Sequence, residues 1–284
     1  MHRARHTRAR RLVAAGLVAF VAVGASLAYA QQIWVGGGRF GRRMAPKWAK
    51  ASDFNGSFLY CRGFYTSFRG EAGGQGWSTD YPDADHNFLT RLAELTRVYI
   101  KDADRNPNFV VIPLEDPLLF RCPVLFMEDI GTAKFSALEV ENLRKFFLKG
   151  GFLWVDDFWG TPAWDVWVNE IGRILPAGEY PIRDIPISHQ IMHMLYDVKE
   201  FPQIPSINFW GQSGGATSER GSDSAQVHFR GIQDGRGRLM VLITHNTDIA
   251  DAWEREGESH EYFNLFSPRG YAIGVNAVLY ALTH

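Results

Sequence analysis

The run from Gly150 to Gly160 constrains the fold of this chain more than any other feature. It begins with two glycines, which are followed by four apolar residues, two aspartates, a phenylalanine, a tryptophan and a final glycine. A short apolar run of this kind, followed by a helix signal, is typical of a strand buried on both faces of a parallel sheet. Open α/β sheets bind their ligands at the carboxyl ends of such strands. Two adjacent carboxylates there, Asp156 and Asp157, are costly to bury unless something pairs with them, so we take this edge as the candidate site.

Strand and helix signals alternate along the rest of the chain. Further strands are predicted at residues 58–65, 109–114, 123–127 and 239–244, and helices follow from about 83, 136, 161 and 270. This alternation predicts an α/β fold, a mostly parallel doubly wound sheet with helices on both faces.

Capping residues and apolar stripes place the helix starts. Ser136 and Glu139 form a capping box, and Thr161 is a candidate cap with Pro162 at the first helical position. Asp83 or Asp85 is expected to cap the helix whose apolar stripe is the following set: Phe88, Leu92, Leu95 and Tyr99.

Residues 1–30 have the pattern of a signal peptide. Arginines without acidic residues precede an apolar stretch from Leu12 to Ala28, and Ala28-Tyr29-Ala30 fits a signal peptidase site. The alternative is an uncleaved anchor, because the stretch reaches the lower limit of a membrane span, roughly 17 residues. Residues 31–56 are predicted to be a flexible linker, and residues 57–284 a single domain.

The charge balance argues against nucleic-acid binding. Five of the 30 basic residues lie in residues 1–30, which leaves 25 against 31 acidic residues and a formal net charge of −6. Nucleic-acid partners require a basic surface. Membrane contact is expected only through the N-terminal segment, if it is not cleaved.

Two cysteines, Cys61 and Cys122, lie in or beside predicted strands. Export would make a disulfide chemically possible, but buried free thiols are the commoner outcome for cysteines in such strands. We therefore expect free thiols.

Polar residues gather at the predicted loop ends that face the candidate site. The candidate ligand-binding residues are Arg69, Trp77, Asp80, Glu128, Asp129, Asp156, Trp159, His193, Asn246, Asp248 and Asp251. If the protein is an enzyme, Asp157 and His189 are the candidate catalytic residues. Asp156 is expected to cap backbone amides under the site while Asp157 points outward. The alternative is a purely structural role for both histidines, in which His189 caps or hydrogen-bonds a neighbouring loop and His193 packs against neighbouring side chains.

Four further sequence patterns bear on a possible catalytic or binding site. No local metal-ligand spacing such as H-E-x-x-H occurs, so no metal or cofactor is expected. Gly211–Gly215 fits G-x-S-x-G, but loop-like residues follow it, whereas a nucleophile elbow runs from strand into helix. Gly36–Gly41 fits G-x-G-x-x-G without the strand and helix that a dinucleotide site requires. Trp77, Trp159 and Trp253 could form an aromatic wall for a glycan, although most tryptophans are core residues.

Five segments together resemble the bacterial domain-of-unknown-function family 4159 (DUF4159). These segments are Gly76–Pro82, Gly150–Asp157, His189–Tyr196, Asp248–Trp253 and Gly274–Tyr280. The resemblance implies a class I glutamine amidotransferase-like fold, a flavodoxin-like three-layer α/β/α sandwich, but no established activity. Amidotransfer requires a cysteine on a strand-to-helix turn; the turn after Val155 contains neither Cys nor Ser, so that activity is not expected.

Two functional hypotheses remain. The first is an exported, non-catalytic ligand-binding or assembly domain of the cell envelope, whose partner is a small molecule, a glycan or an envelope protein. The second is a hydrolase, possibly metal-assisted, acting through Asp157 and His189. Either would reside in the periplasm, or be anchored in the inner membrane and face the periplasm.

Overall fold

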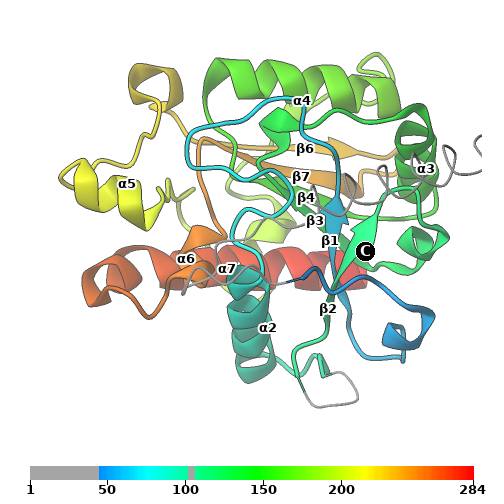
Figure 1. Ribbon diagram of the computed structural model, residues 1–284, viewed down its shortest axis with the longest axis horizontal. Coiled ribbons are helices and arrows are strands. Elements are labelled where there is room, and N and C mark those ends of the chain that lie inside the picture. The colour runs from blue at the N-terminus through cyan, green and yellow to red at the C-terminus, as the bar shows by residue number, and fades with distance from the viewer. Residues whose placement is uncertain (1–44, 102–105) are drawn as a thin grey trace, which may run out of the picture.

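A seven-stranded sheet forms the middle layer of the computed structural model, which describes residues 45–101 and 106–284 (Figure 1). Its strand order is β2-β1-β3-β4-β7-β6-β5. The strands are β1 (Tyr60–Phe64), β2 (Phe109–Pro113), β3 (Val124–Glu128), β4 (Leu153–Asp156), β5 (Arg183–Asp184), β6 (His228–Gln233) and β7 (Leu239–His245). The five strands from β2 to β7 are parallel, and β6 and β5 are added antiparallel. The predicted α/β fold with a mostly parallel sheet is confirmed.

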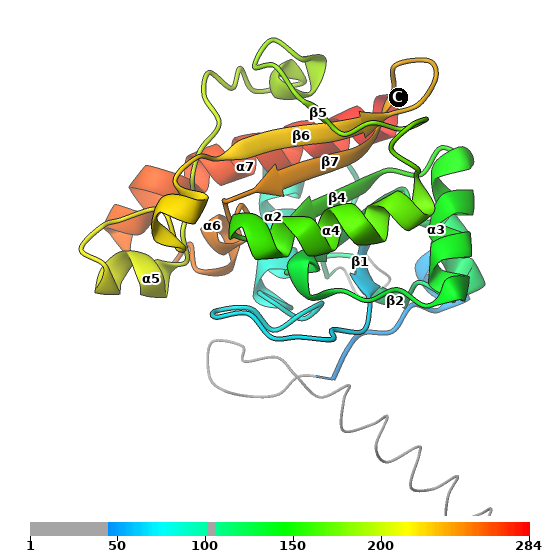
Figure 2. The ribbon, with the colours of Figure 1, turned by 90° about the horizontal axis from the view of Figure 1, so that it is seen from above.

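Helices cover both faces of this sheet (Figure 2). The helices α2 (Asp83–Leu95) and α7 (His260–Thr283) pack on one face, and α3 (Ala137–Leu148) and α4 (Gly160–Ile174) pack on the other. Two short helices, α5 (Ile207–Gln212) and α6 (Asp251–Glu254), lie near the carboxyl ends of the strands. The result is a three-layer α/β/α arrangement.

The alternation of side chains along the strands explains why there are two cores. Phe126 and Trp154 are register neighbours that point into the core under α2 and α7. The next residue of each strand, Met127 and Val155, points into the core under α3 and α4. Strands that are apolar on both faces must be covered on both faces, so the continuous apolar runs of the sequence require this layering.

The predicted helix starts are confirmed for α3 but not for α4. The capping box of α3 is present, since Ser136 Oγ accepts from Glu139 N and Glu139 Oε2 accepts from Ser136 N. Thr161 is not the cap of α4, which begins one residue earlier. Asp223, 62 residues further along the chain, instead accepts from Thr161 N at 2.8 Å and from its hydroxyl at 2.6 Å.

The start and stripe of α2 also differ from the prediction. Pro82 precedes the helix, so neither Asp83 nor Asp85 is its N-cap residue. Phe88 and Leu92 are fully buried as expected, but the stripe ends there. Leu95 and Tyr99 are exposed, because α2 ends at Leu95 and the chain turns away from the sheet.

Part of the predicted linker is ordered. Lys47 O accepts from Val111 N at 2.8 Å, and Ala49 N donates to Val111 O at 3.0 Å. Residues 47–49 therefore pair along the outer edge of β2, and Trp48 packs against Phe64 with 5.4 Å between ring centroids. The prediction of a flexible linker is wrong for residues 45–56. Residues 1–44, which include the predicted signal peptide and Gly36–Gly41, lie outside the described residues.

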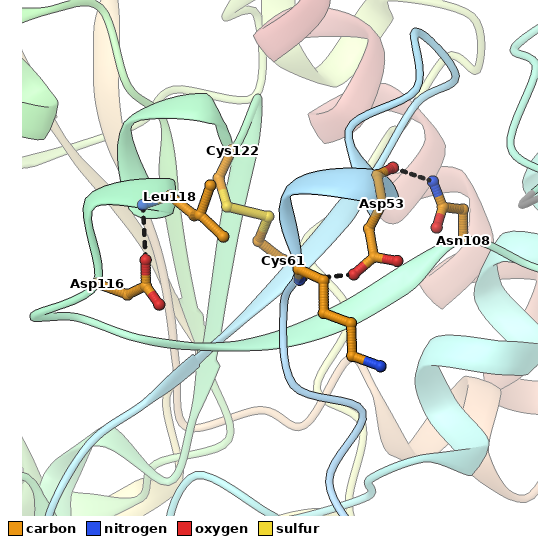
Figure 3. Close-up of a disulfide and its surroundings, with 7 residues drawn as sticks. Asp53, Cys61, Asn108, Asp116, Leu118 and Cys122 are labelled. Carbon is orange, nitrogen blue, oxygen red and sulfur yellow. Dashed lines mark hydrogen bonds between the residues drawn. A yellow bond between two sulfur atoms is a disulfide. The ribbon is translucent and has the colours of Figure 1, made fainter.

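Cys61 and Cys122 form a disulfide, so the expectation of free thiols is wrong (Figure 3). Cys122 follows the 3-10 turn Pro117–Arg121 and lies two residues before the start of β3, which is the parallel neighbour of β1. This turn brings the two Cα atoms to 5.9 Å, within the range that a disulfide spans.

Within the described ranges, no helix has the length and apolar character needed to cross a membrane.

Candidate functional site

Four acidic or amide residues take up left-handed backbone conformations where the chain leaves the sheet. Asp129, Asp157 and Asn246 directly follow β3, β4 and β7, with φ values of 49°, 48° and 62°. Asp80, in the loop after β1, has a φ of 58°. This conformation is uncommon outside glycine and costs on the order of 1–3 kcal/mol, and Asp and Asn tolerate it best. Such strain clusters at functional sites, and here it marks one edge of the sheet.

A cavity of about 120 Å³ lies at this edge, between the strand ends and the loops above them. Its lining contains eight carboxylates but only two arginines. The carboxylates are Glu71, Asp80, Asp129, Asp157, Glu219, Asp248, Asp251 and Glu254, and the arginines are Arg220 and Arg255. Carboxylates at this density repel one another unless cations lie between them.

Burial raises the pKa values of six of these groups, and neighbouring carboxylates raise five of them further; the six are Asp80, Asp129, Asp157, Asp248, Asp251 and Glu254, and Asp129 is the exception to the second effect. The pKa of Asp157 lies well above its usual range, first because the carboxyl is buried and then because Asp129 and Glu219 are close. Burial also raises the pKa of Asp129 to about 7, although the Gly76 amide partly offsets this. A cation bound in the pocket would therefore lower the cost of ionising these carboxyl groups.

The floor of the pocket is a buried ion-pair network. Arg62, the third residue of β1, is completely buried. Its guanidinium pairs with Asp85 of α2, at 2.8 Å between Nη2 and Oδ2, and with Glu128 at the end of β3. It also donates to the carbonyl of Thr79 at 2.9 Å. Burial still raises the pKa of Glu128 to about 8, so one guanidinium does not neutralise this floor.

Asp156 supports the site from below, as predicted. Its Oδ2 accepts from the amides of Ile249 and Ala250 at 2.8 and 3.0 Å, and its Oδ1 accepts from the Thr244 hydroxyl at 2.5 Å. These bonds fix the turn after β7 that carries Asp248 and Asp251. Asp156 thus holds the backbone of the site in place without lining the cavity.

Asp157 itself faces the cavity. The left-handed turn at this residue interrupts the strand alternation and directs the carboxylate toward the pocket, where Oδ1 accepts from Trp159 Nε1 at 2.9 Å. Asn246 ties the neighbouring strand end to the same turn. Its Oδ1 accepts from Gly160 N at 2.8 Å, while its backbone amide donates to Phe158 O at 3.0 Å.

The long loop after β1 closes the cavity on one side. Gly76 N donates to Asp129 Oδ2 at 2.7 Å, and a Cβ atom at Gly74 would collide with the same carboxylate. Arg220 reaches across from the segment between β5 and β6 and donates to Ala72 O at 2.7 Å. Glu219 Oε1 accepts from Ser206 N at 2.7 Å. Segments that are far apart in the sequence thus form the cavity walls.

Most of the predicted ligand-binding residues are brought together. Five of them line the cavity, namely Asp80, Asp129, Trp159, Asp248 and Asp251, together with the candidate catalytic residue Asp157. Glu128, Asp156 and Asn246 lie beneath or beside it. Arg69 lines an adjoining hollow of about 470 Å³, which shares Trp159 and Arg220 with the acidic cavity.

Trp77 is not at the site. It belongs to an aromatic cluster with Trp48, Phe64 and Tyr81, and is 5 % exposed. Trp253 is 1 % exposed and stacks on Phe88 at 4.3 Å. The hypothesis of an aromatic wall for a glycan is therefore wrong for two of its three members.

The two predicted histidines also lie elsewhere. His189 lines a hollow with Arg238 and Tyr280, at the amino end of β7. β7 has seven residues and spans roughly 20 Å. His189 lies at the amino ends of the strands and Asp157 at their carboxyl ends, so the two side chains cannot act on one atom. His189 Nδ1 accepts from Ile191 N at 3.2 Å, so His189 caps the 3-10 turn that directly follows it rather than a neighbouring loop. His193 is exposed and contacts Asp197 and Ile187 O, so it is not packed.

Sequence reasoning missed six charged residues of the site. They are Arg62, Glu71, Glu219, Arg220, Glu254 and Arg255. A signal was present for Arg62, an arginine inside an otherwise apolar strand. Glu219 and Arg220 lie in an irregular segment without periodicity, and only the fold brings them to the cavity.

The G-x-S-x-G match does not build a nucleophile elbow. Ser213 follows the short helix α5 rather than a strand, and its hydroxyl bonds to local backbone at Trp210 and Ala216. This agrees with the prediction from its flanking residues.

The family model described as a domain of unknown function (DUF4159) matches residues 68–282. The chain belongs to the DUF4159 family. The match begins just after β1 and includes every residue that lines the acidic cavity, whereas Arg62 and Cys61 precede it. No curated protein matches the chain.

Asp157→Asn is expected to stabilise the ligand-free protein at pH 8 by about 2 kcal/mol. The folded-state pKa of Asp157 is raised, so between pH 4 and 8 the native state binds more protons than the unfolded state. The free energy of unfolding of the wild type therefore falls as the pH rises. Asparagine tolerates the left-handed turn and carries no ionisable group, so the variant should not show this fall. Urea unfolding should show the difference at pH 8 and none near pH 4. A variant that is less stable at pH 8 would contradict the expectation.

Proposed function

We propose that this chain is an exported binding domain of the cell envelope whose ligand is a cation held in the acidic cavity. The observation that carries the proposal is the lining of the cavity, with eight carboxylates and two arginines around about 120 Å³. Buried carboxylates are costly unless they are paired or bind a cation. A bound cation offsets their desolvation and their repulsion at once, which a neutral or anionic ligand cannot do.

The absence of a catalytic pair supports a non-catalytic role. The turn after β4 carries Asp156 and Asp157 where an amidotransferase-like site would need a cysteine. The nearest imidazole proposed as a partner, His189, is at the opposite sheet edge. We also propose that the sheet is of the class I glutamine amidotransferase-like type; the parallel order β2-β1-β3-β4-β7 with helices on both faces supports this assignment.

A hydrolase that uses Asp157 alone is the second candidate. The strained turn and the raised pKa of this carboxyl suit a general base near neutral pH. In that case the wild type would turn over a substrate and Asp157→Asn would abolish the turnover, whereas a binding domain would show no turnover in either form.

Export is supported by two independent features. Residues 1–30 have the composition of a signal peptide, and disulfides such as Cys61–Cys122 persist in oxidising compartments. Expression of the full chain with a C-terminal tag, followed by fractionation and mass measurement, should give an oxidised protein in the periplasm or facing it. A reduced, full-length protein in the cytosol would contradict export.

The cationic ligand is tested by thermal unfolding of the purified full chain. The panel contains Ca²⁺, Mg²⁺ and Mn²⁺ as metal ions, lysine and spermidine as organic amines, and citrate and phosphate as anions. At pH 7.5 we expect at least one cation to raise the Tm by several degrees, since saturation at 100 times the Kd adds about 2.7 kcal/mol. Stabilisation by the anions alone would overturn the proposal.

A further inference from the structure

We infer that the cation is a hard divalent metal ion, bound between Asp80, Glu128 and Asp248. The inference rests on the proposed function and names the ligand of the same cavity. The three residues come from different parts of the fold: the loop after β1, the last position of β3 and the turn after β7. No local sequence spacing connects them, which explains why no metal motif is visible in the sequence.

The spacing of their oxygens fits one ion. One carboxylate oxygen of each residue lies within 4.8 Å of the corresponding oxygens of the other two. Ca²⁺ holds oxygen ligands at about 2.3–2.6 Å, so two ligands on opposite sides of the ion are roughly 4.8 Å apart. The three oxygens can therefore contact a common ion without large movements.

Unpartnered oxygens provide a second, independent observation. Glu128 is completely buried, and its Oε1 has no hydrogen-bond partner. Asp80 Oδ2 is likewise buried without a partner. Buried polar atoms are almost always satisfied, and two carboxylates of one cluster that each have an unsatisfied oxygen indicate a positive ligand at that point.

A neighbouring acidic group is already neutralised. Asp80, Asp251 and Glu254 also have oxygens within 4.8 Å of one another. However, Arg255 Nε lies 2.6 Å from Glu254 Oε2 and 3.7 Å from Asp251 Oδ1, so an arginine already pairs with two members of that group. Asp80 and Asp248 have no such partner among the described residues, which favours their group as the metal site.

Contacts outside the group hold the ligands in place. The second oxygen of Glu128 is fixed by Arg62, and Asp248 Oδ1 accepts from Asp251 N at 2.8 Å. The amide of Asp248 in turn donates to Ile204 O at 2.9 Å. Ligands oriented by a second layer of bonds bind metals more tightly than free side chains.

The donor set favours Ca²⁺, with Mg²⁺ and Mn²⁺ as weaker candidates. All three ligands are carboxylate oxygens, which suit hard cations, whereas Zn²⁺ and Cu²⁺ sites use imidazole or thiolate. Ligands that extend from two loops and a strand end form an irregular set, and Ca²⁺ tolerates irregular geometry better than Mg²⁺ does.

Calorimetric titration of the chelator-treated full chain with CaCl₂ tests the site. We expect one Ca²⁺ per chain with a Kd in the micromolar range, and a loss of affinity of 100-fold or more in Asp248→Asn. Asp80→Asn is a second variant with the same expected loss. Glu170→Gln removes a buried carboxylate on α4 that pairs with Lys134 and Arg173, so it is the matched control and should retain wild-type affinity.

The outcomes separate this inference from the proposed function. If amines raise the Tm and no metal binds, the cationic ligand stands and the metal site is overturned. If no cation binds at all, both fail. Equal loss in Asp248→Asn and Glu170→Gln would show that binding follows overall charge or folding, and would also overturn the assignment of these ligands.

Discussion

Replacing Arg62 by methionine is expected to lower the free energy of unfolding by about 3–5 kcal/mol at pH 8, because it breaks a buried ion pair by removing one partner. Arg62 is fully buried and pairs with both Asp85 and Glu128, which are also fully buried. Methionine fills similar volume but leaves two carboxyls without a counter-charge. The Thr79 carbonyl also loses its donor.

The loss should depend on pH. Without the guanidinium, Asp85 and Glu128 must take up protons when the chain folds, while the unfolded carboxyls ionise near pH 4. The native state then binds more protons, so the variant loses further stability as the pH rises from 5 to 8. Urea unfolding at both values measures this slope.

Two control variants separate charge from packing. Arg62→Lys keeps the positive charge and should lose less than the methionine variant. Adding Asp85→Asn and Glu128→Gln to Arg62→Met removes the uncompensated charges, and should recover part of the loss at pH 8. An Arg62→Met protein within 1 kcal/mol of the wild type would show that the network contributes little.

The sheet could be predicted from the sequence because its strands are apolar on both faces. Residues 152–155 and 239–244 are continuous apolar runs, and β4 and β7 lie within a residue or two of them. β6 was not predicted, because polar residues such as His228, Arg230 and Gln233 interrupt its apolar pattern. The strand is antiparallel to β7 and lies next to the last strand of the sheet. Strands that are only partly covered lack the continuous apolar signal.

The site could be predicted wherever topology alone decides position. Residues that directly follow parallel strands must meet at one edge, so Asp129 and Asp157 were placed correctly. His189 follows no parallel strand, and nothing in its sequence indicates which edge of the sheet it occupies. The same holds for Glu219 and Arg220, which reach the cavity through an irregular segment held by side-chain bonds such as that between Asp223 and Thr161.

Removal of the disulfide is expected to cost about 4 kcal/mol in the chain-entropy description, because the bond closes a loop with a sequence separation of 61 residues. The double variant Cys61→Ala/Cys122→Ala should unfold at correspondingly lower denaturant concentration. Cys61 is fully buried in the core under α3 and α4, so alanine adds a small packing loss. Wild type measured with and without reductant isolates the bond itself.

The contribution of the disulfide to stability also bears on the compartment in which the protein folds. The bond joins β1 to Cys122, two residues before β3 begins, and β1 carries Arg62 one position after Cys61. Reduction therefore loosens the strand that holds the floor of the acidic cavity. If the domain folds in an oxidising compartment, the reduced chain should lose both stability and cation affinity, and reoxidation should restore them. A reduced chain within 1 kcal/mol of the oxidised one, with unchanged affinity, would remove the disulfide as an argument for export.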